Sequence, residues 1–279
     1  MPQVSMIPAP CRVLEALPQN AHDVRFVVEA PPLPAAAFAP EPGQFVMASL
    51  PGIGEAPFCV SALPGEGTAP GTFELLIRRT GRLTNLLTRL RPGETMYVRG
   101  PYGRRVDWER FEGASLIVMA GGLGLAPLRA FVRRALLRRD AFRRIDVMVG
   151  ARSPDELLFK DELAAWKARR DDVHVRLIVD AAREGWGGRI GVITTLLDNF
   201  EGEVDGSHAF LCGPPVMYRH CLKRLLALGL YEGHLWLTLE RRMRCGIGLC
   251  GNCQVSGHYL CQEGPLFSYR ELRQLREAV

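Results

Sequence analysis

Residues 115–127 read SLIVMAGGLGLAP: an apolar run ends in the glycines Gly121, Gly122 and Gly124, and a helix-compatible segment follows from Ala126. Glycines at a strand-to-helix turn let the backbone approach a pyrophosphate, and the free N–H groups of the helix N-terminus favour an anion. Pro127 stands where the dinucleotide-binding fingerprint has its third glycine, which argues against an ordinary Rossmann site. By itself this loop is a weak signal, and a strand end that binds nothing is the competing interpretation.

A second loop with the same placement lies further along the chain. Cys212-Gly213-Pro214-Pro215-Val216-Met217 follows a predicted strand, 209–212, and opens a predicted helix, 216–228. Ligands of open parallel sheets lie beyond the carboxyl ends of the strands, so the two loops can border one crevice. Cys212 can also be an ordinary packed thiol, but the pair of loops in this order favours nucleotide binding. The residues predicted to line the crevice are Gly122, Gly124, Pro127, Cys212, Gly213, Pro214 and Met217.

Beyond Trp108 the predicted elements alternate, which is typical of a parallel sheet with helices on both faces. The predicted strands are 115–120, 145–149, 173–179, 209–212 and 235–239, and the predicted helices are 126–139, 154–169, 191–197 and 216–228. Ser153, Pro154 and Glu156 resemble a helix start with a capping hydroxyl and a capping box.

The first 106 residues show a different pattern of predicted elements. Short β-compatible runs at 24–29, 45–50, 59–62, 73–78 and 95–99 are separated by prolines and glycines, and a short helix is predicted at 83–90. This spacing predicts a small antiparallel barrel. We therefore expect three parts: a β-barrel at 1–106, an α/β parallel-sheet domain at 107–239 and a Cys-rich segment at 240–279.

Composition narrows the class of protein. The chain has 279 residues, of which 47% are hydrophobic and 23% charged, which excludes intrinsic disorder. The net charge of +5 is too mild and too scattered to predict nucleic-acid binding. No apolar run reaches the 18 residues of a membrane span, and MPQVSMIPAPCR has no secretory pattern. A cytoplasmic location with reduced cysteines is expected.

Four cysteines near the C-terminus carry the strongest signal. Cys245, Cys250, Cys253 and Cys261 form C-x4-C-x2-C-x7-C, so four thiolates within 17 residues can converge on one metal centre. The first three match plant-type [2Fe-2S] spacing, although the fourth usually lies farther along. Structural zinc is the rival interpretation, but zinc ribbons usually show two C-x2-C pairs and only one is present. Cys11 and Cys221 are expected to be ordinary buried thiols.

Together these motifs resemble the ferredoxin:NADP reductase superfamily along essentially the whole chain. The likeness is greatest to the gamma subunit of cytoplasmic NiFe hydrogenases (sulfhydrogenases), and it is carried by PGIGEAP at 51–57, GARSP at 150–154 and ERRM at 240–243. The electron-transfer subunits of anaerobic sulfite reductase and of dihydroorotate dehydrogenase are also similar. The resemblance implies FAD on the barrel, NAD(P)H on the parallel sheet and a [2Fe-2S] cluster on the four cysteines.

For the flavin, the resemblance points to two segments. Pro57-Phe58-Cys59-Val60-Ser61 occupies the place of the motif R-x-Y-S, with Ala56 at the arginine position and Cys59 at the hydroxyl position. Cys59 is therefore either a neighbour of the flavin N5 or a small apolar strand residue. Gly81-Arg82-Leu83-Thr84 fits the second segment, where Thr84 would donate to the pyrophosphate, unless these residues only cap a surface helix. Arg79 or Arg82 is expected to replace the missing cation.

The resemblance also implies the adenosine end of the nucleotide site and the function. Arg152 and Ser153 lie where the ribose is recognised, and an arginine there favours NADPH over NADH. NAD(P)H would give hydride to FAD, and single electrons would pass through the cluster without a catalytic side chain. The expected partner is a hydrogenase small subunit or another iron-sulfur protein docked near Cys250 and Cys261. A free-standing reductase and a zinc-bearing redox sensor are the alternatives.

Overall fold

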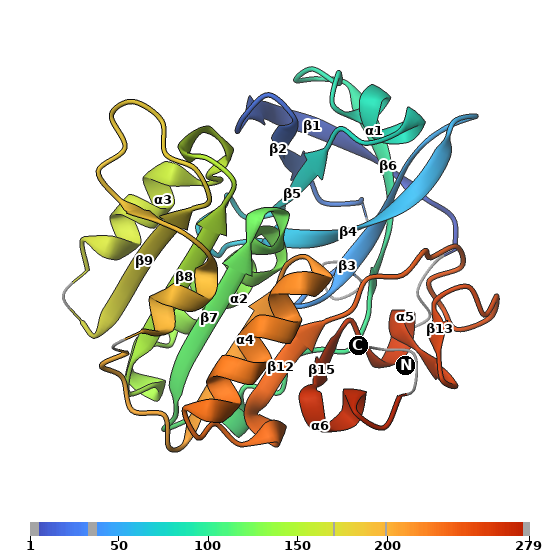
Figure 1. Cartoon of the computed structure of the whole chain (residues 1–279). Coiled ribbons are helices and arrows are strands. Elements are labelled where there is room, and N and C mark those ends of the chain that lie inside the picture. Colours follow the sequence, from blue (N-terminus) through green and yellow to red (C-terminus); the bar gives the residue numbers. More distant parts are fainter. Residues whose placement is uncertain (1–5, 33–37, 170, 199, 276–279) are drawn as a thin grey trace. The chain divides into compact units, whose positions relative to one another are not determined.

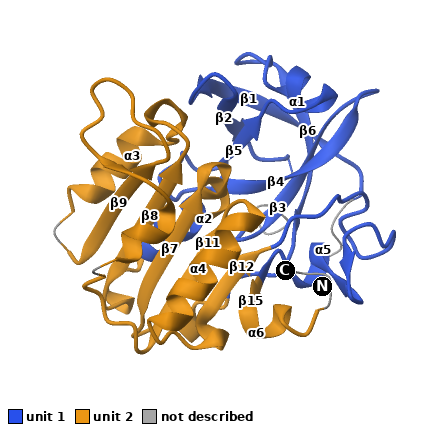
Figure 2. Ribbon diagram, in the orientation of Figure 1, with its two compact units in different colours: residues 1–106, 129–137, 239–266 blue, residues 107–128, 138–238, 267–279 orange. Residues whose placement is uncertain are grey.

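The computed structural model describes residues 6–32, 38–169, 171–198 and 200–275. The chain falls into two compact units (Figure 2). Unit 1 comprises residues 1–106, 129–137 and 239–266, and unit 2 comprises residues 107–128, 138–238 and 267–279. Both units therefore contain segments from distant parts of the sequence.

A closed six-stranded antiparallel barrel forms most of unit 1, as predicted (Figure 1). Its strands run in the order β1-β2-β5-β4-β3-β6. Alternate apolar side chains of these strands fill the barrel interior, among them Phe26, Phe73 and Leu75, all 0% exposed. Helix α1 (Arg82–Leu87) adds Leu87 to this core. The strands are β1 (Ala9–Pro18), β2 (Asp23–Glu29), β3 (Phe45–Leu50), β4 (Gly54–Ala62), β5 (Thr72–Arg78) and β6 (Thr95–Tyr102).

Strand β1 was not predicted, because prolines stand at both of its ends and charged residues interrupt its middle. Cys11 and Val13 nevertheless point into the barrel, at 1% and 0% exposure. As expected, Cys11 and Cys221 are buried thiols, and burial raises the pKa of each to about 12.

Unit 2 is built on a seven-stranded sheet with the order β10-β9-β8-β7-β11-β12-β15. The five strands from β9 to β12 pair in parallel, which confirms the predicted sheet. Because β7 is followed along the chain by β8 on one side and later by β11 on the other, the strand order reverses beside β7. The strands are β7 (Ser115–Gly121), β8 (Ile145–Ala151), β9 (Val173–Val179), β10 (Arg189–Ile190), β11 (Ser207–Cys212), β12 (Leu235–Thr238) and β15 (Leu266–Ser268).

Two of the predicted helices of unit 2 are confirmed and two are not. Helices α2 (Leu125–Leu137) and α4 (Pro215–Ala227) follow the two glycine-containing loops. The predicted helix 154–169 is instead a 3-10 turn, Pro154–Glu156, followed by α3 (Lys160–Lys167). The predicted helix 191–197 is a 3-10 helix, Ile193–Leu197.

The break before α3 has a packing cause. Leu157, Leu158 and Phe159 are all buried, and Phe159 takes a left-handed backbone with φ 52°. Burying three consecutive apolar side chains requires the chain to leave the helical path, since a surface helix turns only one stripe inward. The Ser153 side chain consequently makes no capping hydrogen bond, so the predicted capping box is wrong.

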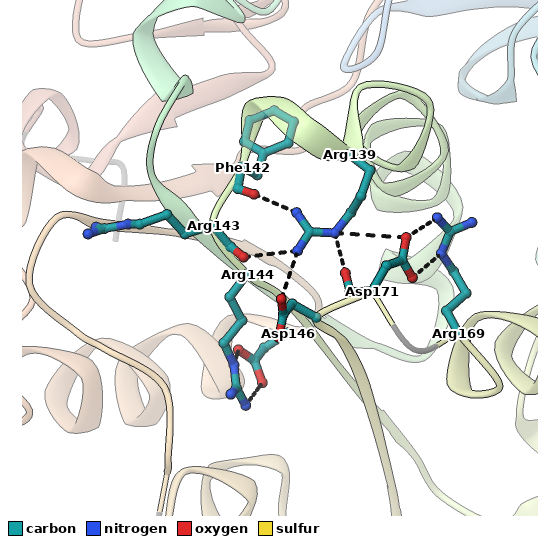
Figure 3. Close-up of polar contacts among 8 residues, drawn as sticks. Arg139, Phe142, Arg143, Arg144, Asp146, Arg169 and Asp171 are labelled. Carbon is teal, nitrogen blue, oxygen red and sulfur yellow. Dashed lines mark hydrogen bonds and ion pairs between the residues drawn. The ribbon is translucent and has the colours of Figure 1, made fainter.

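Arginine side chains make hydrogen bonds and ion pairs around the turn between α2 and β8 (Figure 3). Arg139 donates to the carbonyl oxygens of Phe142 and Arg143, at 2.5 and 2.9 Å, and also contacts Asp171. Arg144 makes a forked ion pair with Asp146, which is 1% exposed. Arginines in this region therefore satisfy backbone carbonyl groups and one buried carboxylate of unit 2 itself.

The C-terminal part contains short elements only. A two-stranded sheet, β13 (Gln254–Val255) and β14 (His258–Tyr259), is followed by α5 (Leu260–Glu263), β15 and α6 (Tyr269–Leu272). Across the described parts of the chain, every helix is too short or too polar to cross a bilayer.

Candidate cofactor-binding sites

The two predicted loops of unit 2 lie in direct contact. A Cβ atom on Gly124 would stand 2.1 Å from the carbonyl oxygen of Cys212 and 2.9 Å from the nitrogen of Gly213. One on Gly121 would stand 2.7 Å from the Met217 sulfur. Only glycine therefore allows the strand ends of β7 and β11 to approach this closely. The loops meet at the carboxyl ends of adjacent strands, where the strand order reverses and nucleotides bind in open α/β sheets.

A hydrogen-bond network fixes the second loop. The Thr238 hydroxyl donates to the Cys212 sulfur at 2.9 Å, and the Tyr218 hydroxyl donates to the Thr238 carbonyl oxygen at 2.8 Å. The Gly213 N–H in turn donates to the Tyr218 oxygen at 3.3 Å. Sequence reasoning did not identify Tyr218 or Thr238, because Thr238 lies 26 residues from Cys212 and belongs to no local motif.

The remaining predicted nucleotide residues lie at the same edge of the sheet. Gly122 has φ +53°, and nothing lies within 4 Å of the position of its Cβ, so this turn is open. Arg152 and Ser153 follow β8, the strand beside β7; Arg152 is exposed and Ser153 is buried. Their backbone is tied to the end of β9, since Ala181 donates its N–H to the Arg152 carbonyl oxygen at 3.0 Å.

The first predicted flavin segment lies on β4 of the barrel. Pro57, Phe58 and Cys59 are each half-buried, and Phe58 packs partly against the barrel core. Cys59 is paired in register with Phe45 of β3. The Ser61 hydroxyl is fully buried and donates to the Glu74 carbonyl oxygen at 3.2 Å, so it has a structural bond within the barrel.

The second predicted flavin segment opens α1. The Thr84 hydroxyl accepts hydrogen bonds from the N–H groups of Thr80 and Gly81, both at 2.9 Å, and thereby caps the start of the helix. Arg79 and Arg82 are exposed, and in the parts of the chain that the structure describes neither has an ion-pair partner.

The four cysteines lie on a segment whose backbone N–H groups point toward the sulfurs of Cys245 and Cys261. The Cys245 sulfur accepts N–H hydrogen bonds from Ile247, Leu249 and Cys250 at 3.3 to 3.5 Å. Gly248 donates its N–H to the Cys261 sulfur at 3.2 Å. Left-handed backbone at Gly246, Gly248 and Gly251, with φ of 79°, 75° and 75°, makes these inward N–H groups possible.

The sulfurs also influence one another's ionisation. Burial raises the pKa of the Cys245 thiol, but the three N–H donors outweigh it and bring the pKa to about 7. Burial raises the pKa of Cys261 to about 12, and the neighbouring Cys253 and Cys245 sulfurs add to this. Four adjacent thiolates repel one another unless cations lie among them, and N–H donors to sulfur are typical of iron-sulfur segments. The donor set therefore fits an iron-sulfur cluster.

Exposure differs among the four thiols. Cys250 is exposed, whereas Cys253 and Cys261 are buried. The chemistry of the four thiols fits a cluster, but their side chains are not drawn together as a metal-ion site: among the described residues, no group of three or more His, Cys, Asp or Glu is arranged to hold a metal ion.

Backbone and side-chain bonds attach the cysteine segment to the end of β6. Gly103 and Arg104 donate their N–H groups to the carbonyl oxygens of Cys261 and Gly264, at 3.0 and 2.7 Å. Arg99, which sequence reasoning missed, donates to the carbonyl oxygens of Arg244 and Cys245.

Three family models match this chain. The oxidoreductase FAD-binding domain matches residues 13–106, and the oxidoreductase NAD-binding domain matches residues 118–223. The iron-sulfur cluster binding domain of dihydroorotate dehydrogenase B matches residues 240–273. The three matches follow one another along the chain in the order of barrel, parallel sheet and cysteine segment.

Similar whole proteins are also known. Sulfhydrogenase 2 subunit gamma of Pyrococcus furiosus is 36% identical over 257 residues, which are 87% of this chain and 88% of that one. A probable dihydroorotate dehydrogenase B (NAD(+)) electron transfer subunit of Thermococcus kodakarensis is 34% identical and covers 83% of this chain and 86% of its own. The solved NADH-dependent reduced ferredoxin-NADP oxidoreductase has the same fold, with a TM-score of 0.74 at 24% identity over 99% of this chain and 96% of its own.

Proposed function

The chain belongs to the family of FAD- and NAD-binding oxidoreductases that includes the sulfhydrogenase gamma subunits, and on that premise we propose that it is an NAD(P)H-linked electron-transfer subunit of a cytoplasmic NiFe hydrogenase. One observation carries the proposal: a single chain combines the barrel, the paired nucleotide loops and four cysteines on a segment with inward N–H groups. When bound, FAD and a [2Fe-2S] cluster supply the exchange between two-electron hydride transfer and single-electron transfer.

We assign the cofactors to the predicted residues, with FAD on 1–106, the nicotinamide nucleotide on 107–239 and the cluster on 240–279. Cys245, Cys250, Cys253 and Cys261 hold the cluster. Pro57, Phe58, Cys59, Val60, Ser61, Arg79, Gly81, Arg82 and Thr84 line the flavin site. Gly122, Gly124, Pro127, Arg152, Ser153, Cys212, Gly213, Pro214 and Met217 line the nucleotide site.

Within these sites, the side chains and backbone of the chain would orient the cofactors and neutralise their phosphate charges. The close contact of Gly124 with Cys212 keeps the two loops side by side. The hydrogen bond from the Thr238 hydroxyl fixes the position of the Cys212 sulfur. The unpaired guanidinium groups of Arg79 and Arg82, within the described residues, are available to the FAD pyrophosphate. Arg152 would pair with the 2′-phosphate, which makes NADPH the preferred donor.

We place the exit for electrons on the side of Cys250, because this thiol is exposed whereas Cys253 and Cys261 are buried. A partner would therefore dock beside Cys250 rather than beside Cys261. The partner we propose is an iron-sulfur subunit of the hydrogenase.

The cofactor content of freshly purified, anaerobically handled protein tests the proposal. We expect a yellow-brown protein with about one FAD and about two irons per chain. A colourless protein that contains zinc and no flavin would support the redox-sensor alternative instead. Co-purification from the native cell then separates a subunit of a complex from a free-standing reductase, which would be fully active alone.

Replacing Cys261 by serine tests the cluster assignment. FAD reduction by NAD(P)H should remain at the rate of the unmodified chain, whereas electron delivery to the partner should slow, because the fourth thiolate is lost. Cys221→Ala, which removes a buried thiol outside the segment, is the control. Unchanged delivery in Cys261→Ser would rule out Cys261 as a ligand.

The similarity to dihydroorotate dehydrogenase B electron transfer subunits favours a second candidate, the same role in a dihydroorotate dehydrogenase complex. The partner that co-purifies distinguishes the two, since only a hydrogenase partner contains nickel.

A further inference from the structure

Arg99 of β6 is buried in unit 1, at 5% exposure, and every N–H of its guanidinium has an acceptor. The Nε and one Nη2 hydrogen go to the two carboxylate oxygens of Glu55, at 2.7 and 2.5 Å. The other donors go to the Tyr102 hydroxyl oxygen at 2.9 Å and to the carbonyl oxygens of Cys245 and Arg244, at 2.5 and 2.6 Å. A guanidinium has five N–H donors, so this one is completely used.

Its acceptors come from two places that the proposed function needs at a fixed separation. Glu55 lies on β4, two residues before Pro57 of the proposed flavin segment. The two carbonyl oxygens belong to Cys245, the first proposed cluster ligand, and to the residue before it. One buried side chain therefore connects the flavin-bearing strand to the start of the cluster segment.

The ion pair makes this connection rigid. The Glu55 carboxylate meets the buried guanidinium at two points, Nε and Nη2, and compensates its positive charge. A charged donor to a carbonyl oxygen is stronger than a neutral one. Removing Glu55 would leave the buried guanidinium charge without its carboxylate.

On the basis of the proposed function, we propose that Arg99 is a positioning residue that holds Cys245 in the orientation needed for cluster binding and at a fixed separation from the flavin-bearing strand. In this role it would act through the backbone of residues 244 and 245 and through Glu55 rather than by contact with a cofactor. Outer residues that orient metal ligands typically change metal affinity by about 10- to 100-fold when they are replaced.

Arg99→Lys is the main test, because lysine keeps the charge but lacks the five-donor fork. Arg78→Lys is the matched control: Arg78 makes the same fork, at 2.7 and 2.6 Å, to Asp23, which is 0% exposed, in the same barrel. The full chain of each variant is reconstituted anaerobically with iron and sulfide. Iron loss to a chelator, the electron paramagnetic resonance spectrum of the reduced cluster and the FAD content are then measured.

We expect Arg99→Lys to lose iron about tenfold faster or more and to show an altered cluster spectrum, with its FAD retained. Arg78→Lys should keep the iron-loss rate and spectrum of the unmodified chain. Equal iron loss and identical spectra in both variants would overturn the role of Arg99. If the unmodified chain itself takes up no iron, the proposed function fails as well, which is a different result.

Glu55→Gln provides a second variant in case Arg99→Lys does not fold. It keeps the bonds from Arg99 to the two carbonyl oxygens but removes the carboxylate that fixes the guanidinium. Amide hydrogen exchange of residues 245–250 should be faster than in the unmodified chain, both with and without the cluster. Unchanged exchange in Glu55→Gln would contradict the proposal without reference to activity.

Discussion

At Gly124 the space for a side chain is already occupied by backbone, because a Cβ would lie 2.1 Å from the carbonyl oxygen of Cys212. Gly124→Ala should therefore push the two loops apart, lower the stability of the chain by about 1–3 kcal/mol and weaken NADPH binding. Thermal unfolding and nucleotide titration measure both effects. Gly187→Ala, with nothing within 4 Å of its Cβ, is the control and should change neither. Normal NADPH affinity in Gly124→Ala would contradict the placement of the nucleotide site.

Arg152 is exposed, so its charge is available to a ligand. If it pairs with a 2′-phosphate, Arg152→Ala should weaken NADPH binding about tenfold while NADH binding changes little. Steady-state FAD reduction with each donor gives the ratio of kcat/KM values. An equal loss with NADPH and NADH would show that Arg152 does not read the 2′-phosphate.

At the scale of elements, β11 and β12 carry a titratable group inside the sheet. His208 is 5% exposed, its Nδ1 accepts from the Trp236 indole at 3.2 Å, and its ring lies 4.0 Å from that of His234. Burial, and then the charges of His234 and Arg110, lower the pKa of His208 to about 4. The folded chain therefore keeps His208 neutral at pH values where the unfolded chain protonates it.

Stability should follow that difference in pKa. Above pH ~6.5 the imidazole is neutral in both the folded and the unfolded state. As the pH falls from ~6.5 toward 4, the unfolded state binds a proton first, so the free energy of unfolding decreases by up to about 3 kcal/mol. Tm measured between pH 4 and 7 should fall less steeply in His208→Asn than in the unmodified chain. His22→Asn, at an exposed position, should leave the slope unchanged. Equal slopes in all three proteins would rule out His208 as the cause.

Elements with a local signal were predictable, and those set by distant partners were not. The strand Phe45–Leu50 and both glycine-containing loops follow from apolar runs punctuated by glycine and proline. The helix predicted at 154–169 failed because Leu157 to Phe159 are buried by tertiary packing, which no capping pattern reports. The cysteine segment was predictable from the spacing of its cysteines, and an iron-sulfur cluster binding domain matches it. Arg99 was not, since its acceptor at Cys245 lies 146 residues away.

At the scale of the whole molecule, the surface beside the proposed cluster is basic and apolar. Arg241, Arg242 and Arg244 are exposed, Cys250 is exposed and Leu249 is 77% exposed. A partner that docks there should present acidic groups, so its association should weaken as salt concentration rises.

Arg242→Glu should lower the association rate with the partner by about tenfold at low salt, while FAD reduction stays unchanged. Surface-immobilised partner protein and stopped-flow reduction measure the two quantities. Lys167→Glu makes the same charge change at an exposed position in unit 2 and serves as the control. An equal loss of association rate in both variants would mean that overall charge, rather than this surface, steers the partner.

The interleaving of the two units bears on how the protein is made. Residues 239–266 belong with the barrel unit and residues 267–279 with the sheet unit, and β15 forms the outermost strand beyond β12. Unit 1 is complete only after residues 239–266 have been synthesised, and unit 2 only after residues 267–279 have followed. No single cut in the chain releases either unit intact, so exchanging residues 1–106 between relatives would leave each product with a unit 1 assembled from two different proteins.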